Sequence, residues 1–362
     1  MKMALELAKK GCGYVNPNPM VGAVIVKDGE IIGQGYHERY GGLHAERNAI
    51  DNCAADSLKG AALYVTLEPC CHYGKTPPCT EAIINSGVNK VVIGNRDPNP
   101  LVAGKGIEML RRHNIEVIEG VLAEECRVLN EEFFYFIKTK RPYVVMKYAM
   151  TIDGKIAAFT GQSKWITGEL ARQDVHQDRH RYSAIMVGIG TVLADDPLLT
   201  CRIENGRNPV RIICDTNLRI PLDSQIVSTA KDIPTIVATA CQNEEKKLPL
   251  IDKGCRIAAI STENGHIDLH GLMAELGGEN IDSVLLEGGG TLNWSALLSG
   301  VVNKVKAYIS PKIIGGIDAK TPVAGRGVEH PDNAFILVNS KVSRLGEDFL
   351  IESEVKQTCL QE

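Results

Sequence analysis

The chain has 362 residues, of which 44% are hydrophobic and 23% charged, and its formal net charge is -4. This length predicts two domains of about 150 residues each, with cores of ordinary size. The small negative charge argues against nucleic acid as a partner, and no apolar run reaches the roughly 20 residues of a membrane span. Because the first residues lead directly into an amphipathic helix without a signal-peptide pattern, we expect a cytoplasmic protein.

The first third of the chain alternates between strand and helix patterns. Asp28-Gly29 between two apolar runs predicts a β-hairpin turn, and Gly87 is expected to end a helix. The expected helices cover residues 3–10, 44–53, 79–86 and 106–113, and the expected strands cover residues 21–27, 30–35, 62–66, 91–94 and 115–119. A hairpin followed by helix–strand units predicts an α/β domain with a mixed sheet covered by helices.

A polar, basic segment, Lys138-Thr139-Lys140-Arg141-Pro142, separates this pattern from a second one. We expect the domain boundary there, with domains at residues 1–140 and 143–360. The second pattern is also α/β. Strands are expected at residues 143–150, 184–188, 210–215, 235–239, 284–287 and 304–309, and the helices between them include residues 169–182 and 292–298.

Eleven cysteines in a chain of this length do not indicate a disulfide scaffold, which is typical of small secreted domains. Their number is odd, and no pairing pattern is visible outside residues 70–79. We therefore expect reduced, mostly structural thiols at the positions outside this segment, namely Cys12, Cys53, Cys126, Cys201, Cys214, Cys241, Cys255 and Cys359.

Three residues spread over the segment from His44 to Cys79 predict a catalytic zinc site. His44, Cys70 and Cys79 would give zinc one imidazole and two thiolates and leave its fourth position to water. Glu46, two residues after the histidine, could carry protons to and from that water. Zinc-dependent deaminases use this arrangement, with the glutamate outside the ligand set.

The spacing of the two cysteines departs from the usual Pro-Cys-x-x-Cys signature, since residues 71–78 lie between them. Cys71 and His72 are alternative ligands, although it is Cys70 that follows the proline as the signature requires. On a regular helix, His44 and Glu46 would lie about 200° apart. We therefore expect the metal to face the end of this helix rather than its side.

The segments Thr66–Cys79 (TLEPCCHYGKTPPC), Asn16–Gly22 (NPNPMVG) and Asp97–Pro100 (DPNP) resemble the deaminase half of the bifunctional riboflavin-biosynthesis deaminase/reductases. In that family the long Cys-to-Cys loop is normal. The resemblance implies a cytidine-deaminase-like α/β/α fold and a phosphoribosylated diaminopyrimidinone as substrate. It also implies substrate-binding roles for Asn18, His37, Lys75 and Asn99, while plain turn formation by Asn-Pro is the alternative for the two asparagines.

The second pattern lacks the GxGxxG sequence of a Rossmann fold. Residues 282–286 are expected to form a strand that leads through Glu287-Gly288-Gly289-Gly290-Thr291 into a helix. Glycines in this position can expose backbone amides to a phosphate, although three consecutive glycines are also typical of a plain turn.

Three further segments, Lys147–Lys155 (KYAMTIDGK), Ser163–Thr167 (SKWIT) and Gly188–Thr200 (GIGTVLADDPLLT), resemble the reductase half of the same family. The resemblance implies a dihydrofolate-reductase-like α/β fold with NADPH as the hydride donor. It implies a dinucleotide site formed by Ala149, Trp165, Thr191, Asp195, Gly289, Gly290, Thr291, Leu292, Asn293, Trp294 and Ser295. It implies a substrate site formed by Ser163, Arg179, Leu198, Arg202 and Glu287.

The side chains of the implied reductase site suit its chemistry. Arg179 and Arg202 can each grip a ribose phosphate with two parallel hydrogen bonds, while a solvated surface position is the alternative for both. Trp165 could instead belong to the core. Lys147 and Asp195 are expected to be catalytic by ordering the reacting ribose and assisting proton movement, and the sequence leaves open which does which.

Together the two resemblances predict a bifunctional enzyme that deaminates the diaminopyrimidinone and then reduces its ribosyl group to ribityl. The expected cofactors are one zinc ion per chain and NADPH. The expected partner is the small-molecule substrate, with no nucleic acid or membrane, and we expect a homo-oligomer, either a dimer or a tetramer. The alternatives are a cytidine, guanine or tRNA-adenosine deaminase with an unrelated appendage, and a structural zinc module closed by a fourth protein ligand.

Overall fold

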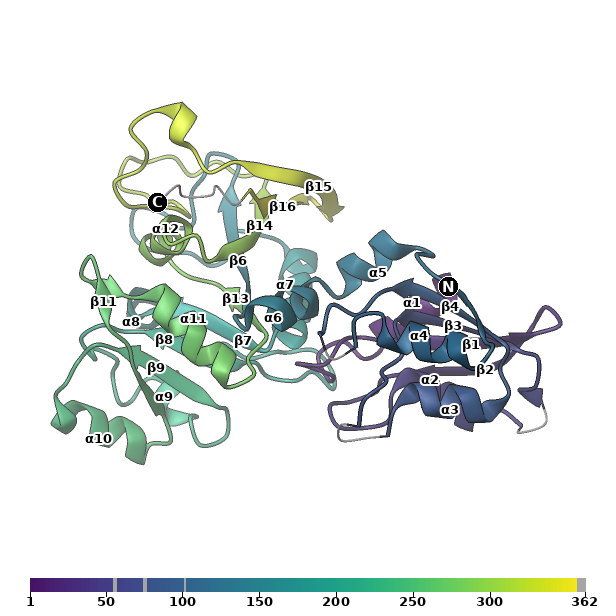
Figure 1. The fold of residues 1–362 in the computed structure, drawn as a ribbon. Helices are drawn as coiled ribbons and strands as arrows, with labels where there is room; N and C mark the ends of the chain where they lie inside the picture. The colour runs from purple at the N-terminus through teal and green to yellow at the C-terminus, as the bar shows by residue number, and fades with distance from the viewer. Residues whose placement is uncertain (55–56, 74–76, 101, 357–362) are drawn as a thin grey trace. The chain divides into compact units, whose positions relative to one another are not determined.

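The computed structural model describes residues 1–54, 57–73, 77–100 and 102–356. The chain divides into two compact units, Met1–Lys140 and Arg141–Glu362, and each contains a sheet with its own helices (Figure 1). Within the described part of the chain, no helix combines the length and apolar character needed to cross a bilayer. The described cysteines are all free thiols.

The first unit is built on a five-stranded sheet in the order β2-β1-β3-β4-β5. Its strands are β1 (Gly22–Lys27), β2 (Glu30–Tyr36), β3 (Ala62–Leu67), β4 (Lys90–Asn95) and β5 (Glu116–Ile118). β1 runs antiparallel to β2 and β3, whereas β3, β4 and β5 run parallel, which confirms the predicted mixed sheet. Asp28 and Gly29 have φ angles of 51° and 85°, the left-handed conformation that a tight hairpin turn requires.

The helices of this unit are α1 (Lys2–Lys9), α2 (Ala45–Asp51), α3 (Cys79–Ser86), α4 (Lys105–Arg112), α5 (Ala123–Leu129) and α6 (Glu131–Thr139). The first four lie where the sequence pattern predicts helices, and Gly87 ends α3 in the left-handed conformation. The pattern does not predict α5 and α6. Asn130, between these two helices, exchanges hydrogen bonds with the backbone of Met20 and so fixes the segment before β1.

A glycine lets α2 lie directly on strand β2. A Cβ atom at Gly35 would come within 2.5 Å of the Ala45 carbonyl oxygen and 2.3 Å of the Ala49 amide nitrogen, closer than real Cβ atoms approach. Only glycine therefore fits here without moving the helix. Because α2 has His44 as its N-cap and Glu46 in its first turn, this close packing fixes the position of both side chains.

The second unit is built on a nine-stranded sheet in the order β10-β9-β8-β7-β13-β6-β14-β16-β15. Its strands are β6 (Tyr143–Thr151), β7 (Ala184–Gly188), β8 (Val210–Cys214), β9 (Thr235–Thr239), β10 (Arg256–Ala259), β13 (Ser283–Leu286), β14 (Val302–Ser310), β15 (Leu337–Leu345) and β16 (Asp348–Val355). From β10 to β14 all neighbours run parallel, and β16 and β15 add an antiparallel hairpin at one edge. β11 (Thr262–Glu263) and β12 (His266–Ile267) form a separate small ribbon.

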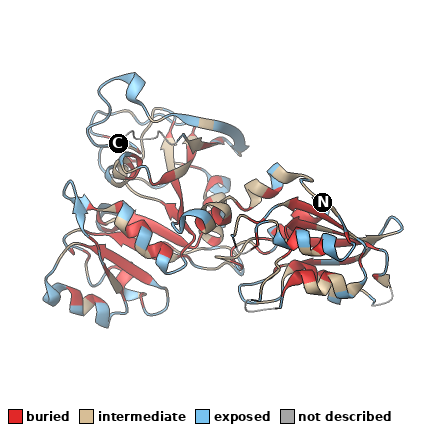
Figure 2. Cartoon of the chain, viewed as in Figure 1, coloured by how far each residue is buried: buried red, intermediate tan, exposed pale blue. Residues whose placement is uncertain are grey.

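Helices cover both faces of this sheet: α7 (Glu169–Arg181), α8 (Ile189–Asp195), α9 (Gln225–Ser228), α10 (Glu244–Asp252), α11 (Leu269–Gly278) and α12 (Gly290–Leu298). Figure 2 shows the central strands buried and β15 largely exposed. Ile212 and Ile213 are neighbours on β8, yet each is fully buried and each belongs to a different core. Burial on both faces explains why these strands appear in the sequence as continuous apolar runs.

Replacing Gly35 with alanine should lower the free energy of unfolding of the first unit by about 1–3 kcal/mol, because the new methyl group would displace α2 from the sheet. Thermal unfolding of the full chain measures this loss. Gly278→Ala, at a helical position with open space around the glycine, is the matched control and should leave stability unchanged or slightly raised. A Gly35→Ala protein as stable as the control would contradict the packing argument.

Candidate active sites

The first site brings together three side chains from different elements. His44 is the extended N-cap of α2, Cys79 is the first residue of α3, and Cys70 follows β3. The Nδ1 atom of His44 lies 3.5 Å from the Cys70 sulfur and 3.4 Å from the Cys79 sulfur. Two ligands on a tetrahedral zinc ion are separated by about 3.6 Å when the Zn–N and Zn–S bonds have their usual lengths. The donor set and its spacing therefore fit zinc.

Both helices direct their first turns toward this cluster. Because His44 precedes the first helical residue, its side chain and that of Glu46 need not lie on opposite sides of α2, in agreement with the expectation that the metal faces the helix end. The backbone amide of Cys79 donates a hydrogen bond to the sulfur of Cys70 at 3.3 Å. Hydrogen bonding with Cys79, assisted by His44 and opposed by burial, lowers the pKa of Cys70 to about 4. The same hydrogen bond and burial raise the pKa of Cys79, so without a metal the pair shares one proton, which resides on Cys79 and leaves Cys70 as the thiolate.

Among the described residues, the ligand cluster contains Cys70 and neither of the alternatives, Cys71 and His72. His72 lines the cavity beside the cluster and is not among the three ligand atoms. The described residues therefore supply three ligands, which is the number typical of a catalytic zinc site.

Glu46 lies at the wall of this cavity, which has a volume of about 270 Å³. Its side chain is only 3% exposed, and burial raises the pKa of Glu46 above its usual range. A carboxyl group in these surroundings holds a proton at pH values where an exposed glutamate would lose it. Its position beside the ligand cluster, without belonging to it, suits a proton carrier.

Asn18 and His37, both predicted substrate residues, line the same cavity as a hydrogen-bonded pair. The His37 Nδ1 atom lies 2.9 Å from the Leu43 carbonyl oxygen, and the Asn18 amide nitrogen lies 3.2 Å from His37 Nε2. A carbonyl oxygen can only accept, so Nδ1 carries the proton and Nε2 accepts from Asn18. Burial lowers the pKa of His37, which favours this neutral form. The pair holds the Asn18 amide in one orientation at the cavity wall.

Asn99 also lines the cavity, and its backbone amide donates to the Asp97 carboxylate. Asp97 and Glu68 were not predicted as site residues, although both lie in the segments that carry the family resemblance. Glu68 is buried and accepts hydrogen bonds from the backbone amides of Asp97, Gly104 and Ile107, so it ties the segment carrying Asn99 to the end of β3. Burial raises the pKa of Asp97 to about 6. Lys75 lies outside the described residues.

The second site is a larger cavity, about 790 Å³, at the carboxyl ends of the strands of the second unit. Predicted residues from several elements line it: Lys147, Ala149, Ser163, Trp165, Arg179, Thr191, Asp195, Leu198, Arg202, Glu287 and Gly289. Trp165 is 61% exposed, so the alternative of a core tryptophan is wrong. Parallel α/β sheets typically bind their ligands in a crevice at this edge.

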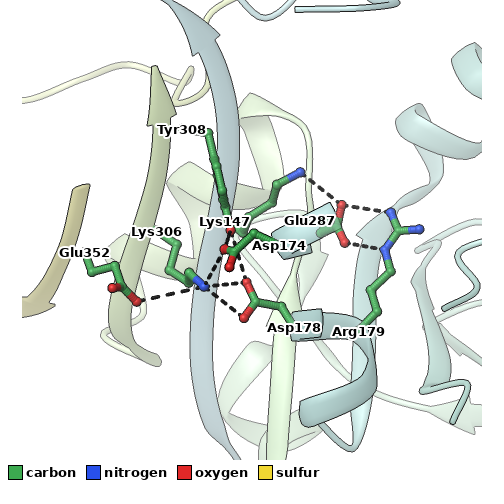
Figure 3. A network of polar contacts seen from close by, with 8 residues as sticks. All are labelled: Lys147, Asp174, Asp178, Arg179, Glu287, Lys306, Tyr308 and Glu352. Atoms are coloured by element: carbon green, nitrogen blue, oxygen red, sulfur yellow. Dashed lines mark hydrogen bonds and ion pairs between the residues drawn. The ribbon is translucent and has the colours of Figure 1, made fainter. Parts of the chain in front are cut away.

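Glu287 joins two of the cationic side chains in this cavity (Figure 3). Arg179 meets its carboxylate with two nitrogens, at 2.8 and 3.1 Å, and Lys147 Nζ lies 3.3 Å away. The Arg179 side chain is only 14% exposed, so the alternative of a solvated surface arginine is wrong. Burial alone would raise the pKa of Glu287, but Arg179 and Lys147 lower it to about 2. The carboxylate is therefore ionised throughout the physiological range.

Two further cavities continue from the second site along residues 188–195 and 289–292 and together form a groove. Gly289 is the N-cap of α12, so unpaired backbone amides of that helix lie beside this groove, as a phosphate group would require. Thr291, Leu292 and Ser295 line it as well. The sequence-predicted dinucleotide residues Gly289–Leu292 therefore adjoin an elongated space, with Ser295 farther along the helix.

Two predicted dinucleotide residues point elsewhere. The Asn293 side chain is fully buried and donates to the Pro322 carbonyl oxygen, and the Trp294 ring packs edge-on against Phe335. Neither lines the groove described above. On a helix, residues that follow Leu292 by one or two positions face away from it, which accounts for the difference. These two side chains therefore pack and support α12 instead of facing the groove, as the implied dinucleotide role would require.

Other residues at the second site were not singled out from the sequence. His176 lines the main cavity one helical turn before Arg179, and helical spacing alone could have identified it. Burial, followed by the positive charges of Arg179 and Arg202, lowers the pKa of His176, so its imidazole is neutral. Thr216 and Arg219 line the far end of the groove, and no sequence signal marks them.

Replacing Glu287 with glutamine should lower the free energy of unfolding of the second unit by about 2 kcal/mol near neutral pH, because two partly buried cations lose their counter-charge. The pKa of Glu287 falls from an ordinary 4.5 to about 2 on folding. The ionised carboxylate therefore stabilises the fold fully at pH values above the pKa of Glu287 in the unfolded chain. This stabilisation is lost as pH falls toward the pKa of Glu287 in the folded protein.

The difference in stability between wild type and Glu287→Gln should consequently shrink as urea unfolding is repeated from about pH 7 to about pH 3. Glu347→Gln, at an exposed turn position, serves as the control. A penalty for Glu287→Gln that stays constant across this range would show that the ion pair does not stabilise the fold.

Both halves of the chain match known proteins. Residues 1–95 match the family "Cytidine and deoxycytidylate deaminase zinc-binding region", and residues 142–351 match "RibD C-terminal domain". The riboflavin biosynthesis protein RibD of Actinobacillus pleuropneumoniae is 54% identical over 352 residues, covering 97% of this chain and 93% of the relative. That of Escherichia coli (strain K12) is 39% identical and covers 96% of each chain.

Solved structures agree with these relatives. Acinetobacter baumannii RibD superimposes with a TM-score of 0.88 at 37% identity and covers 98% of both chains. The diaminohydroxyphosphoribosylaminopyrimidine deaminase/5-amino-6-(5-phosphoribosylamino)uracil reductase of Thermotoga maritima superimposes with a TM-score of 0.85 at 43% identity and covers 98% of this chain and 97% of its own. With both halves matched in order and the relatives covered almost end to end, the chain belongs to the RibD family of bifunctional riboflavin-biosynthesis enzymes, in which a zinc-binding deaminase region precedes a reductase domain.

Proposed function

We propose that this chain deaminates 2,5-diamino-6-(5-phosphoribosylamino)pyrimidin-4(3H)-one in its first unit and reduces the product with NADPH in its second. The product of the second step is 5-amino-6-(5-phosphoribitylamino)uracil. The observation that carries the proposal is the convergence of His44, Cys70 and Cys79 beside the buried Glu46, in a chain that also contains the reductase domain. A homo-oligomeric state, dimer or tetramer, is part of the proposal and can be measured by sedimentation.

In the first unit, His44, Cys70 and Cys79 would hold one zinc ion, which when bound supplies Lewis-acid activation of water. Glu46 takes a proton from the water that attacks the amino-bearing ring carbon and delivers it to the adjacent ring nitrogen. It then moves the remaining hydroxyl proton to the departing amino group. Ammonia then leaves, and the oxygen of the water remains on the ring as a carbonyl. The elevated pKa that burial imposes on Glu46 suits it to both transfers.

Residues at the cavity wall would orient the pyrimidine for this step. Asn18, held by His37, and Asn99, held through Asp97, offer side-chain amides for hydrogen bonds to the ring edge. We include Lys75 as a phosphate ligand because of its charge and its position in the Cys-to-Cys segment. The pre-arranged amides would reduce the entropy lost on binding.

In the second unit, NADPH would supply a hydride to the first ribose carbon of the deaminated product. Ala149, Trp165, Thr191, Asp195, the Gly289–Leu292 segment and Ser295 are the residues we propose to hold the dinucleotide. Ser163, Arg179, Leu198, Arg202 and Glu287 would hold the phosphoribosyl group. Lys147 and Asp195 would order the sugar and deliver the proton that its ring oxygen gains when the ring C–O bond breaks.

A coupled assay tests both steps in one solution. The diaminopyrimidinone phosphoriboside and NADPH are supplied together, and ammonia release and NADPH oxidation are followed in parallel. The proposal expects one ammonia released for each NADPH oxidised, with ammonia appearing first. Ammonia release without NADPH oxidation would reduce the account to a deaminase with an unrelated second domain.

Replacing Glu46 with glutamine should leave zinc bound but slow ammonia release by at least about 100-fold, because glutamine cannot accept or return a proton. Metal content measured on the purified variant separates loss of catalysis from loss of the ion. Glu108→Gln, on the exposed side of α4, is the matched control and should retain activity. Full turnover by the Glu46→Gln protein would end the proposed mechanism.

Replacing Lys147 with alanine should slow NADPH-dependent reduction by about 100-fold and leave ammonia release unchanged, because the residue belongs to the second unit alone. Reduction is measured with deaminated substrate supplied directly. Lys341→Ala, on the exposed strand β15, controls for removal of a lysine charge. Equal loss of both activities would argue against separate sites.

A further inference from the structure

A second cluster of charges lies beside Lys147, between strand β14 and helix α7 (Figure 3). Lys306 Nζ lies 2.7 Å from an Asp178 carboxylate oxygen and 3.3 Å from an Asp174 oxygen. The Tyr308 hydroxyl donates to the Asp174 carboxylate at 2.6 Å. The two aspartates are one helical turn apart, so both face the same strand. None of the proposed catalytic steps uses these residues.

The register of the sheet explains why this cluster is needed. In the parallel pairing of β6 with β14, Lys147 lies opposite Lys306 and Ala149 lies opposite Tyr308. Two lysines in neighbouring positions on adjacent strands repel each other unless each has a counter-charge. Asp174 and Asp178 compensate Lys306, which leaves Lys147 to interact with Glu287 and with the cavity.

Tyr308 links the two clusters. The Lys147 Nζ atom lies 5.8 Å from the centroid of the Tyr308 ring, within the range of a cation–π interaction. Tyr308 is fully buried, and its hydroxyl is bonded to Asp174 and, at 3.3 Å, to Asp178. Burial and these two carboxylates raise the pKa of Tyr308, so the hydroxyl stays protonated and the ring stays anchored.

We propose that Tyr308 is a positioning residue of the reductase site, whose anchored ring holds the Lys147 ammonium group beside Glu287. This inference rests on the proposed role of Lys147 in reduction. Tyr308 itself is fully buried and lies outside the residues that line the cavity, so it acts through Lys147 rather than on substrate or cofactor.

A double-mutant cycle tests the inference in the full-length protein. Tyr308→Leu removes the ring and should lower kcat for reduction about tenfold, which lies between the values for an exposed and a fully desolvated cation–π contact, while KM for the deaminated substrate changes less than about twofold. Tyr308→Phe keeps the ring and should recover activity to within about threefold of wild type. Ammonia release, measured on the same preparations, serves as the internal standard for folded enzyme.

The second arm repeats Tyr308→Leu in a Lys147→Met background, under single-turnover conditions with enzyme in excess. If Tyr308 acts through Lys147, replacing it should lower the rate of reduction no further once Lys147 is gone. If Tyr308 is purely structural, its replacement should lower that rate equally in both backgrounds. Asp174→Asn weakens the anchor without opening a cavity and gives the same comparison if Tyr308→Leu does not fold. Asp174→Asn should lower kcat for reduction by about threefold, and only when Lys147 is present.

The outcomes separate the two ideas. If Lys147→Met reduces substrate at the wild-type rate, the proposed role of Lys147 fails and the inference fails with it. If Lys147→Met is strongly impaired but Tyr308→Leu causes the same loss in both backgrounds, or raises KM instead of lowering kcat, only the inference about Tyr308 is overturned. A loss of kcat confined to the background with Lys147 supports it.

Discussion

The first active site depends on the meeting of two helix starts. The N-cap residue of α2 and the first residue of α3 bring His44 and Cys79 within 3.4 Å, and the end of β3 adds Cys70. Gly35 supports this meeting because it lets α2 contact the sheet, and Glu68 fastens the neighbouring segment that carries Asn99. A metal bound there would cross-link these segments, so the geometry of the site and the packing of the fold are coupled.

The two units place their polar site residues in the same way. In each, polar residues follow or end parallel strands whose carboxyl ends lie at one edge of a sheet. Asp97 comes after β4 in the first unit, and Glu287 comes directly after β13 in the second. The strands themselves are apolar and buried, so they hold these side chains rigidly while helix starts supply backbone amides. The second unit differs in that its charges are largely paired with one another, and Glu287 sets where both Arg179 and Lys147 point.

The sequence predicts the parts of this molecule that carry strong local patterns. The hairpin turn at Asp28-Gly29 and the buried parallel strands follow from residue types at short spacing, and the metal-ligand set follows from His-x-Glu and Pro-Cys motifs whose residue types match zinc chemistry. β15 could not be predicted in this way, because an exposed edge strand has no apolar pattern. The burial of Arg211 could not be predicted either, because arginine is seldom fully buried; threonine hydroxyls and backbone carbonyls from distant segments accept its hydrogen bonds. Asp174 and Asp178 likewise resemble solvated helix charges, and only the sheet register shows that they face Lys306.

The central claim is that three protein ligands hold one zinc ion and leave its fourth position open. Zinc K-edge X-ray absorption on the purified full-length protein tests it most directly. The account predicts two sulfur neighbours at about 2.3 Å, one imidazole nitrogen at about 2.0–2.1 Å and one further light atom that exchanges with solvent or added inhibitors. A third sulfur or a second imidazole in the zinc shell, unaltered by such additions, would mean a closed structural site and would contradict the account.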